Sequence, residues 1–250
     1  ARSGEAVWVF GATLKTLVST SRGVSYWESG NDKRIFYTKG ADLWALNAHI
    51  GQPIPSFGKG GKIDLRSGLH ASAQDKFVIS STPGTIYKNL IIMPIRLSEG
   101  VGAAPGDVMA FDAITGELAW SFHTLPRPGE TGIETWGDPN ISESPIVGAA
   151  NNWAGMALDQ KREILFVPTG SASPDFYGAL RPGKNLYSNC LLALNANTGK
   201  LLWHYQFIHH DLWDRDLPAP PNLITVNHGG KKIAAVAQVT KQGYVFVFDR

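Results

Sequence analysis

The sequence has very little cysteine: Cys190 is the only one among 250 residues, which excludes an internal disulfide. That count is compatible with either a reducing or an oxidising compartment. Cys190 stands in the apolar run Cys-Leu-Leu-Ala-Leu, which is typical of a structural core. We therefore expect Cys190 to be a buried core thiol.

Charge and long apolar runs are also scarce. Charged residues make up 18% of the chain, the formal net charge is +2, and no run of five basic residues occurs. This balance argues against nucleic acid or an anionic membrane as a partner. No apolar stretch approaches the ~20 residues of a membrane-spanning helix, so we expect no transmembrane segment in this chain. The 43% of hydrophobic residues predict an ordered globular protein with a full core.

A short unit recurs along the chain, built on a turn glycine and a tryptophan four residues later. One copy has proline in place of the tryptophan. The copies are Gly4 with Trp8, Gly51 with Pro55, Gly116 with Trp120, and Gly199 with Trp203. In the last two copies the glycine follows Asp-Ala-Ile-Thr or Asn-Ala-Asn-Thr, which is hairpin-turn chemistry because glycine supplies a positive φ.

Short runs with β-strand character flank these turns, and no long window has helical periodicity. The runs are Asp107–Phe111, Ile164–Val167, Leu191–Leu194, Ala234–Ala237 and Tyr244–Phe248. Many short strands, glycine turns and a tryptophan at a fixed offset predict an all-β fold, a β-propeller of about four blades. The turns are unevenly spaced, so we expect long functional loops between blades.

Both ends of the chain lead us to expect a segment of a longer protein. Ala1-Arg2-Ser3-Gly4 resembles the interior of a sequence, and no signal peptide is visible. The run from Val245 to Arg250 stops where earlier copies reach their turn. Four blades are too few for the larger rings that leave no exposed sheet edge. We expect the isolated segment to be inactive, because half a ring leaves its pocket open.

The densest group of ionisable side chains lies at residues 209–216, which read His-His-Asp-Leu-Trp-Asp-Arg-Asp. Clustered carboxylates repel one another unless a cation or a proton relieves them. Lys241 follows downstream, and we expect Trp203 and Trp213 to hold the loop rigidly against a core. Carboxylates on a rigid loop near a lysine indicate general-base chemistry beside a metal or a polar cofactor.

Three motifs together resemble the quinoprotein dehydrogenases, a family of eight-bladed propellers that carry pyrroloquinoline quinone (PQQ) and a divalent metal. They are the turn Asn195–Trp203, the run His209–Asp214, and Lys241-Gln-Gly-Tyr-Val-Phe-Val. The resemblance covers residues 1–250, which we interpret as a partial propeller domain with about half of the ring. Leu-Trp-Asp with a downstream lysine is similar to the membrane glucose dehydrogenase branch.

The resemblance implies a catalytic role for Asp214 and Lys241. Asp214 matches the aspartate that takes the substrate hydroxyl proton while hydride passes to the quinone C5, and its ionised carboxylate suits that role. Lys241 matches the basic residue that hydrogen-bonds the quinone oxygens and stabilises negative charge on the reduced quinone. The alternative, purely structural interpretations are that Asp214 caps a turn and that Lys241 is a solvated residue of a hairpin.

Three further positions match residues that hold the PQQ ring system in the family. Trp153, in Asn151-Asn152-Trp153, matches the aromatic floor beneath the rings. Arg22 matches an arginine beside the cofactor, where a guanidinium suits the three PQQ carboxylates. Ser81, with its neighbours Ser80 and Thr82, lies near a hydroxyl-bearing position that contacts the cofactor. Core packing of Trp153 and surface exposure of Arg22 are the alternatives.

The resemblance also implies a site for Ca²⁺ or Mg²⁺, formed by Glu99, Ser171 and Asp214. Glu99 falls where relatives place a metal-binding glutamate, with a loop of different length. Ser171 stands where the family has asparagine, and a hydroxyl is a weaker oxygen donor than an amide carbonyl. Ca²⁺ nevertheless tolerates mixed oxygen ligands.

The implied function is the PQQ-dependent oxidation of an aldose, polyol or alcohol in the periplasm, with inner-membrane association through other regions left open. The sequence has no Cys-x-x-Cys-His haem motif, so electrons would pass to a quinone or another acceptor. We expect one of His209 and His210 to line the substrate pocket and the other to pack. Two alternatives remain: a non-catalytic propeller scaffold of the outer-membrane assembly type, and a six-bladed soluble aldose dehydrogenase.

Overall fold

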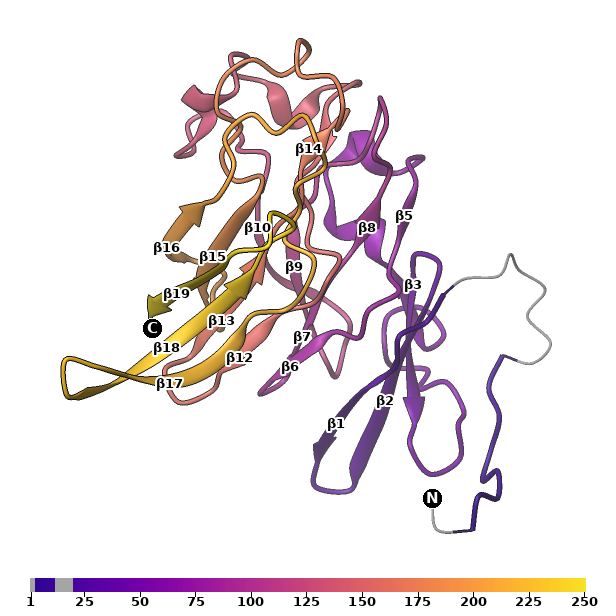
Figure 1. Cartoon of the computed structure of the whole chain (residues 1–250). Coiled ribbons are helices and arrows are strands. Elements are labelled where there is room, and N and C mark those ends of the chain that lie inside the picture. The colour runs from indigo at the N-terminus through magenta and orange to yellow at the C-terminus, as the bar shows by residue number, and fades with distance from the viewer. Residues whose placement is uncertain (1–2, 12–19) are drawn as a thin grey trace.

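The computed structural model describes residues 3–11 and 20–250. In these residues the chain forms a succession of small antiparallel sheets that lie side by side, as the blades of a propeller do (Figure 1). Each sheet is built largely from neighbouring segments of the chain. The result agrees with the prediction of an all-β fold made of hairpin repeats.

Three sheets have four strands each. The first sheet, in the order β1-β2-β3-β4, consists of β1 (Ser25–Ser29), β2 (Asp32–Lys39), β3 (Asp42–Asn47) and β4 (Lys62–Asp64). The second, in the order β10-β9-β7-β6, consists of β6 (Thr85–Tyr87), β7 (Leu90–Met93), β9 (Val108–Asp112) and β10 (Leu118–Phe122). The third, in the order β12-β13-β15-β16, consists of β12 (Ala157–Asp159), β13 (Ile164–Pro168), β15 (Cys190–Asn195) and β16 (Leu201–Gln206).

The remaining strands form smaller sheets. A three-stranded sheet consists of β17 (Asn222–His228), β18 (Lys231–Val239) and β19 (Val245–Asp249). Two short pairs join β5 (Val78–Ile79) to β8 (Arg96–Leu97) and β11 (Gly148–Ala149) to β14 (Ala172–Ser173). Four single-turn 3₁₀ helices lie in the connections: η1 (Leu65–Gly68), η2 (Ala71–Ala73), η3 (Ile133–Thr135) and η4 (Ile141–Glu143).

The core lies between successive sheets, because alternate side chains of each inner strand face opposite neighbours. On β9, Met109 and Phe111 pack into the cluster shared with the first sheet, and Val108 and Ala110 into the cluster shared with the third. Strands that are buried on both faces are apolar at nearly every position and do not alternate between polar and apolar residues. The predicted core thiol, Cys190, belongs to the cluster between the second and third sheets and is fully buried.

The recurring tryptophans dock one sheet onto the turn of the next. The Trp120 indole Nε1 donates to the Ala196 carbonyl at 3.2 Å, and its ring lies where a β-carbon on Gly199 would be. Gly199 also has φ +70°, so two independent reasons exclude a side chain there. Trp8 makes the equivalent contact with the Ala48 carbonyl, at 3.1 Å. The turn motif therefore recurs because each blade needs both halves of this contact.

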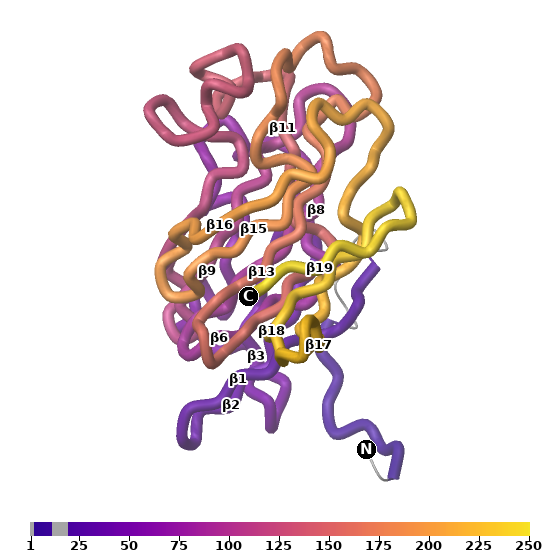
Figure 2. The backbone as a smooth tube through the Cα atoms, turned by 60° about the vertical axis from the view of Figure 1, so that its left-hand side comes forward, coloured from indigo at the N-terminus to yellow at the C-terminus, as the bar shows by residue number. Residues whose placement is uncertain are grey.

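Long loops extend from one end of the molecule. Figures 1 and 2, drawn from different sides, both place residues 123–147 and 174–189 at the same end. Among the residues that the structure describes, no helix has the length and apolar character needed to cross a bilayer.

Candidate active site

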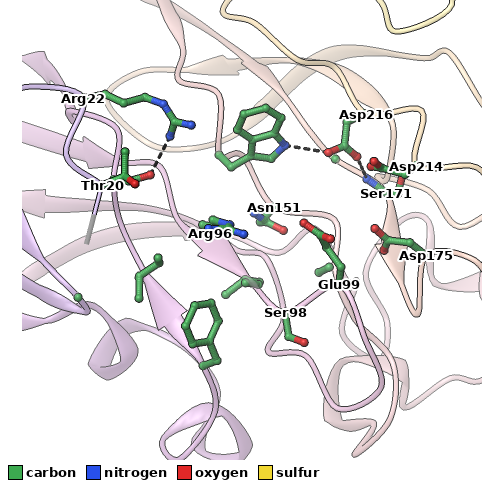
Figure 3. Close-up of a pocket in the computed structure, with 18 of the residues that line it drawn as sticks. Thr20, Arg22, Arg96, Ser98, Glu99, Asn151, Ser171, Asp175, Asp214 and Asp216 are labelled. Atoms are coloured by element: carbon green, nitrogen blue, oxygen red, sulfur yellow. Dashed lines mark hydrogen bonds between the residues drawn. The ribbon is translucent and has the colours of Figure 1, made fainter. Parts of the chain in front are cut away.

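A cavity of about 860 Å³ brings together the seven residues that the sequence predicts to be catalytic, cofactor-binding or metal-binding. Its wall includes Arg22, Ser81, Glu99, Trp153, Ser171, Asp214 and Lys241. These residues come from loops and strand ends of different blades, so only the tertiary fold can assemble them. Figure 3 shows the polar side chains of this wall facing a common space.

Asp214 and Lys241 form an ion pair at the cavity. Lys241 Nζ lies 2.9 Å from Asp214 Oδ2 and also donates to the Asp214 main-chain carbonyl at 2.9 Å. Partial burial alone would lower the pKa of Lys241, but the hydrogen bond to Asp214 and the nearby carboxylates outweigh it and raise that pKa. Lys241 is therefore an ammonium group at neutral pH, held against the carboxylate by two contacts.

The local backbone turns the Asp214 side chain toward the cavity. Asp214 has φ +52°, a left-handed conformation that aspartate and asparagine adopt more readily than most residues. Within the described residues, Asp214 Oδ1 accepts no hydrogen bond, whereas Oδ2 faces Lys241. One carboxylate oxygen is thus available to an incoming proton.

Asp216 connects the aromatic side of the cavity to its acidic side. Its Oδ2 accepts the indole Nε1–H of Trp153 at 2.8 Å, and its Oδ1 accepts the main-chain N–H of Ser171 at 2.7 Å (Figure 3). Lys241 Nζ lies 3.7 Å from the same Oδ2 atom. A single partly buried carboxylate therefore orients the indole and the loop that carries Ser171.

Arg22 and the hydroxyl residues near it line the opposite side of the indole. Arg22 Nη1 donates to Ser81 Oγ at 2.8 Å and to Thr82 Oγ1 at 3.3 Å, and its guanidinium carbon lies 5.8 Å from the centre of the Trp153 ring. Thr82 Oγ1 in turn donates to the Trp153 carbonyl at 2.8 Å. The tryptophan is held at its backbone and at its indole nitrogen, which leaves a rigid aromatic plate beside a cation.

Asp175 is the most unusual acid of the site. The residue is 4% exposed, and its Oδ1 atom is buried without a hydrogen-bond partner in the protein. Burial, together with the charges of Asp216, Asp214 and Glu99, raises the pKa of Asp175 to about 8, although Arg181 opposes the shift. The Asp175 N–H donates to the Glu99 carbonyl at 3.2 Å, so the two acids lie on adjoining loops.

These side chains have the chemistry that a hard divalent cation requires. Asp175 has a buried carboxylate oxygen without a hydrogen-bond partner, and other carboxylates lie near it. A bound cation would coordinate that oxygen and offset the repulsion between the carboxylates. No three acidic, histidine or cysteine side chains of the described residues converge closely enough to form a complete ligand set by themselves. The donor set fits Ca²⁺ or Mg²⁺ in charge and atom type, provided that the side chains draw together around the ion.

Ser171, the third predicted metal ligand, is held by a buried polar network. Its Oγ donates to Asp211 Oδ2 at 2.5 Å and accepts from Asn189 Nδ2 at 3.0 Å. A hydroxyl oxygen has two lone pairs, so one remains after these contacts. Ser171 also lines the cavity, between Gly170 and the loop of Asp175.

Asp211 braces the loop that carries Asp214, a role that sequence reasoning assigned to tryptophan. Asp211 is buried, and its carboxylate accepts the main-chain N–H groups of Trp213 at 3.0 Å and Arg215 at 2.6 Å. The predicted packing of Trp213 is wrong, because that side chain is 70% exposed. Trp203 does pack, with its ring centre 5.8 Å from that of Phe166.

The histidine prediction is also wrong, because neither His209 nor His210 lines the cavity. The ring Nδ1 of His210 lies 2.7 Å from the Gly183 carbonyl, and His209 borders a separate surface hollow.

Sequence reasoning missed four residues of the site: Asp175, Arg181, Asp216 and Arg96. Asp216 had a usable signal, since it lies two residues after Asp214 in the same acidic run. Arg181 is fully buried and donates to the carbonyls of Pro174 and Asp211, which nothing in its neighbourhood of the sequence predicts. Asp175 acquires its position through a contact between two loops, and Arg96 through the pairing of β8 with β5.

The fold and the site together define a β-propeller with a polar cavity large enough for a planar, multiply charged cofactor. Comparison with known proteins narrows that class. Residues 1–250 match the family model described as the glucose/ethanol/alcohol dehydrogenase β-propeller domain, with PQQ as its short name. The chain therefore belongs to the PQQ-dependent dehydrogenase family, and its predicted fold, a partial propeller of the quinoprotein type, is confirmed.

Individual relatives agree with this assignment. The chain is 33% identical to quinoprotein glucose dehydrogenase of Escherichia coli, over 100% of this chain and 33% of the relative. It is 37% identical to quinate/shikimate dehydrogenase (quinone) of Acinetobacter baylyi, over 87% of this chain and 27% of the relative. The structure of quinohemoprotein alcohol dehydrogenase from Comamonas testosteroni matches with a TM-score of 0.81 and 25% identity, over 100% of this chain and 37% of that one. The chain thus spans about a third of the length of these relatives.

Proposed function

We propose that this chain forms the PQQ-binding part of a dehydrogenase that oxidises a hydroxyl group of an aldose, polyol or alcohol. The observation that carries the proposal is the convergence of a carboxylate, an ammonium group and an indole on one cavity. Asp214 and Lys241 form an ion pair there, and Trp153 is hydrogen-bonded to Asp216 within reach of the same ammonium. Structural packing alone does not require this arrangement.

PQQ is a flat tricycle with three carboxylates, and the cavity offers matching groups. Its volume of about 860 Å³ falls within the roughly 300–1,000 Å³ of small-molecule sites. The Trp153 indole supplies a stacking surface, and Arg22 supplies a guanidinium for a carboxylate. Ser81 adds a hydroxyl beside Arg22.

A divalent cation, Ca²⁺ or Mg²⁺, would be held by oxygen atoms of the acidic side. We assign Glu99, Ser171 and Asp214 as ligands, and add Asp175 because its buried Oδ1 has no other partner. The additional carboxylate compensates for serine at a position where a stronger neutral donor is usual in the family. The cation would offset the mutual repulsion of the four carboxylates.

When bound, PQQ with its cation supplies the two-electron acceptor for the substrate hydride. Asp214 accepts the hydroxyl proton through Oδ1, because its Oδ2 faces Lys241. Lys241 remains an ammonium throughout, since its contacts raise its pKa, and it stabilises negative charge that develops nearby. Asp216 and Arg22 fix the position of Trp153 without taking part in proton transfer.

The family also bears on location and on electron transfer. We propose a periplasmic protein that passes electrons to a quinone or another acceptor. The relatives named for glucose and for quinate or shikimate indicate a hydroxyl-rich substrate, and the identities do not select one of them.

The competing hypothesis, a propeller scaffold, needs the docked tryptophans but not this cavity wall. A dye-reduction assay on the full-length protein, reconstituted with PQQ and Ca²⁺, separates the two. We expect reduction of an artificial dye with at least one of glucose, quinate and ethanol, and its loss in Asp214→Asn. Absence of both turnover and retained PQQ absorbance would refute the enzyme assignment.

A further inference from the structure

Arg96 is a cavity residue that the proposed chemistry leaves unused. It lies on β8, opposite Ile79 of β5, and both side chains line the cavity. Figure 3 shows Arg96 between the side of the cavity that carries Arg22 and the side that carries Glu99.

The Arg96 guanidinium has no partner among the residues that the structure describes, whether by hydrogen bond, ion pair or ring contact. Glu99 follows three residues later on the same wall, yet the two side chains form no ion pair. Two other arginines, by contrast, form ion pairs: Arg34 pairs with Asp32, and Arg250 pairs with Asp159. The fold therefore does not account for a guanidinium at this position.

The charges of the cavity are arranged unevenly. Glu99, Asp175, Asp214 and Asp216 lie on one side, while Arg22 and Arg96 lie toward the other (Figure 3). Lys241 belongs to the acidic side, because it pairs with Asp214. Arg22 is already committed through Nη1 to Ser81 and Thr82. All the N–H donors of the Arg96 guanidinium are thus available to a ligand, whereas some of the Arg22 donors are already used within the protein.

A guanidinium with all its donors free matches a carboxylate, which it binds through two parallel hydrogen bonds. We propose that Arg96 is a carboxylate-binding residue of this cavity. The inference rests on the proposed function, and it goes further by naming a recognition element and a ligand chemistry. Two ligands carry that chemistry: the tricarboxylate cofactor, whose carboxylates outnumber the single guanidinium assigned above, and a hydroxycarboxylate substrate such as quinate.

Three variants test the proposal in the full-length protein. Arg96→Gln removes the charge and the paired donors, and Arg96→Lys keeps the charge without the planar fork. Arg215→Gln is the matched control, because Arg215 is exposed, lies outside the cavity and has no side-chain partner among the described residues. Because the exposed side chain of Arg96 makes no hydrogen bond, ion pair or ring contact among the described residues, we expect all three variants to unfold at the same urea concentration as the wild type.

Two readouts distinguish the ligands. The first is the dissociation constant of PQQ, measured with Ca²⁺ by quenching of protein fluorescence in the absence of substrate. The second is the KM for quinate compared with the KM for glucose in PQQ-saturated enzyme. A hydrogen-bonded charge pair contributes about 1.5–3 kcal/mol, so its loss weakens binding by roughly 10- to 150-fold.

If Arg96 holds the cofactor, Arg96→Gln raises the dissociation constant of PQQ by at least about tenfold and changes both KM values equally. If Arg96 holds the substrate, PQQ binding is unchanged and the KM for quinate alone rises by about tenfold or more. Arg96→Lys gives a smaller effect of the same kind in either case. Arg96→Gln that matches the wild type and Arg215→Gln in both readouts overturns the inference but leaves the proposed function intact. A wild-type protein that binds neither PQQ nor quinate contradicts both.

Discussion

The indole nitrogen of Trp153 donates to Asp216 Oδ2 at 2.8 Å, and this bond joins the aromatic plate to the acidic loop of the cavity. The two residues are far apart in the sequence, and Asp216 also accepts the Ser171 main-chain N–H. Rotation of the indole would break a charge-assisted hydrogen bond, so the plate is fixed before any ligand arrives. Preorganisation of this kind reduces the cost of binding a flat cofactor.

Asp216→Asn should therefore weaken PQQ binding. An asparagine side chain can accept only one of the two N–H groups, and its amide would face the other donor. The loss of a charge-assisted hydrogen bond predicts a dissociation constant about 10- to 100-fold higher, measured by fluorescence titration. Trp153→Phe keeps a ring but removes the indole N–H, so the two substitutions should couple in a double-mutant cycle. Purely additive effects would contradict the positioning role of Asp216.

Asp214→Asn should reduce kcat by about 10²- to 10⁴-fold, the usual contribution of a general base. Asparagine tolerates the positive φ at this position and still accepts a hydrogen bond from Lys241, so folding should be unaffected. The measurement is steady-state dye reduction at saturating substrate, with PQQ content determined by absorbance. A kcat within a factor of about three of the wild-type value, at equal PQQ content, would rule out Asp214 as the base.

Asp175 should make the stability of the metal-free protein decrease as pH rises. Its pKa is about 8 in the folded state and 3.8 as an ordinary aspartate, so between those values the folded state binds a proton that the unfolded state has lost. Folding is then favoured at low pH and progressively less favoured up to about pH 8, by at most ~1.4 kcal/mol per pH unit. Asp175→Asn removes this dependence.

Urea unfolding of both proteins at pH 5 and pH 8, in the presence of a chelator, measures the effect. The variant should gain stability relative to the wild type as pH rises, because all other titrating groups are common to both. Excess Ca²⁺ should narrow the difference in unfolding free energy between the variant and the wild type at pH 8, because the cation favours the ionised carboxylate of Asp175. Stability curves that stay parallel across this range would show that Asp175 is not a buried proton-binding group.

Trp120→Ala should cost about 3–5 kcal/mol of unfolding free energy, as is usual for a buried aromatic side chain. The indole packs over Gly199 and donates to the Ala196 carbonyl, so its removal separates the second sheet from the third. Trp213→Ala is the control, and its effect should stay within about 0.5 kcal/mol because the side chain is largely exposed. Equal losses in the two variants would contradict the docking role of the repeated tryptophan.

The sequence was sufficient to predict the fold class because the residues that repeat are the ones that each blade needs in order to dock onto the next. A turn glycine and a tryptophan at a fixed offset are the two halves of one contact between blades, and Trp120 with Gly199 shows it directly. The degenerate copy is instructive as well. Pro55 cannot make the contact, and Gly58 instead donates its N–H to the Thr115 carbonyl at 2.8 Å beside Phe57.

The site was predicted to the extent that its residues lie in recognisable motifs. The seven predicted residues line one cavity, but Asp175 and Arg96 carry no local pattern. Asp175 is buried because its loop meets the loop of Glu99, and Arg96 enters the cavity because β8 pairs with β5. The burial predicted for Trp213 was wrong because it was inferred from side-chain type alone, and the side chain is 70% exposed. The loop is in fact braced through main-chain N–H groups by Asp211.

The most direct test is a crystal structure of the full-length protein with PQQ and Ca²⁺. We predict that the tricycle lies against the Trp153 indole, with its quinone end toward Lys241 and Asp214 and with Ca²⁺ among the carboxylates. PQQ bound elsewhere, or a cavity in which these three side chains do not contact the cofactor, would contradict the account.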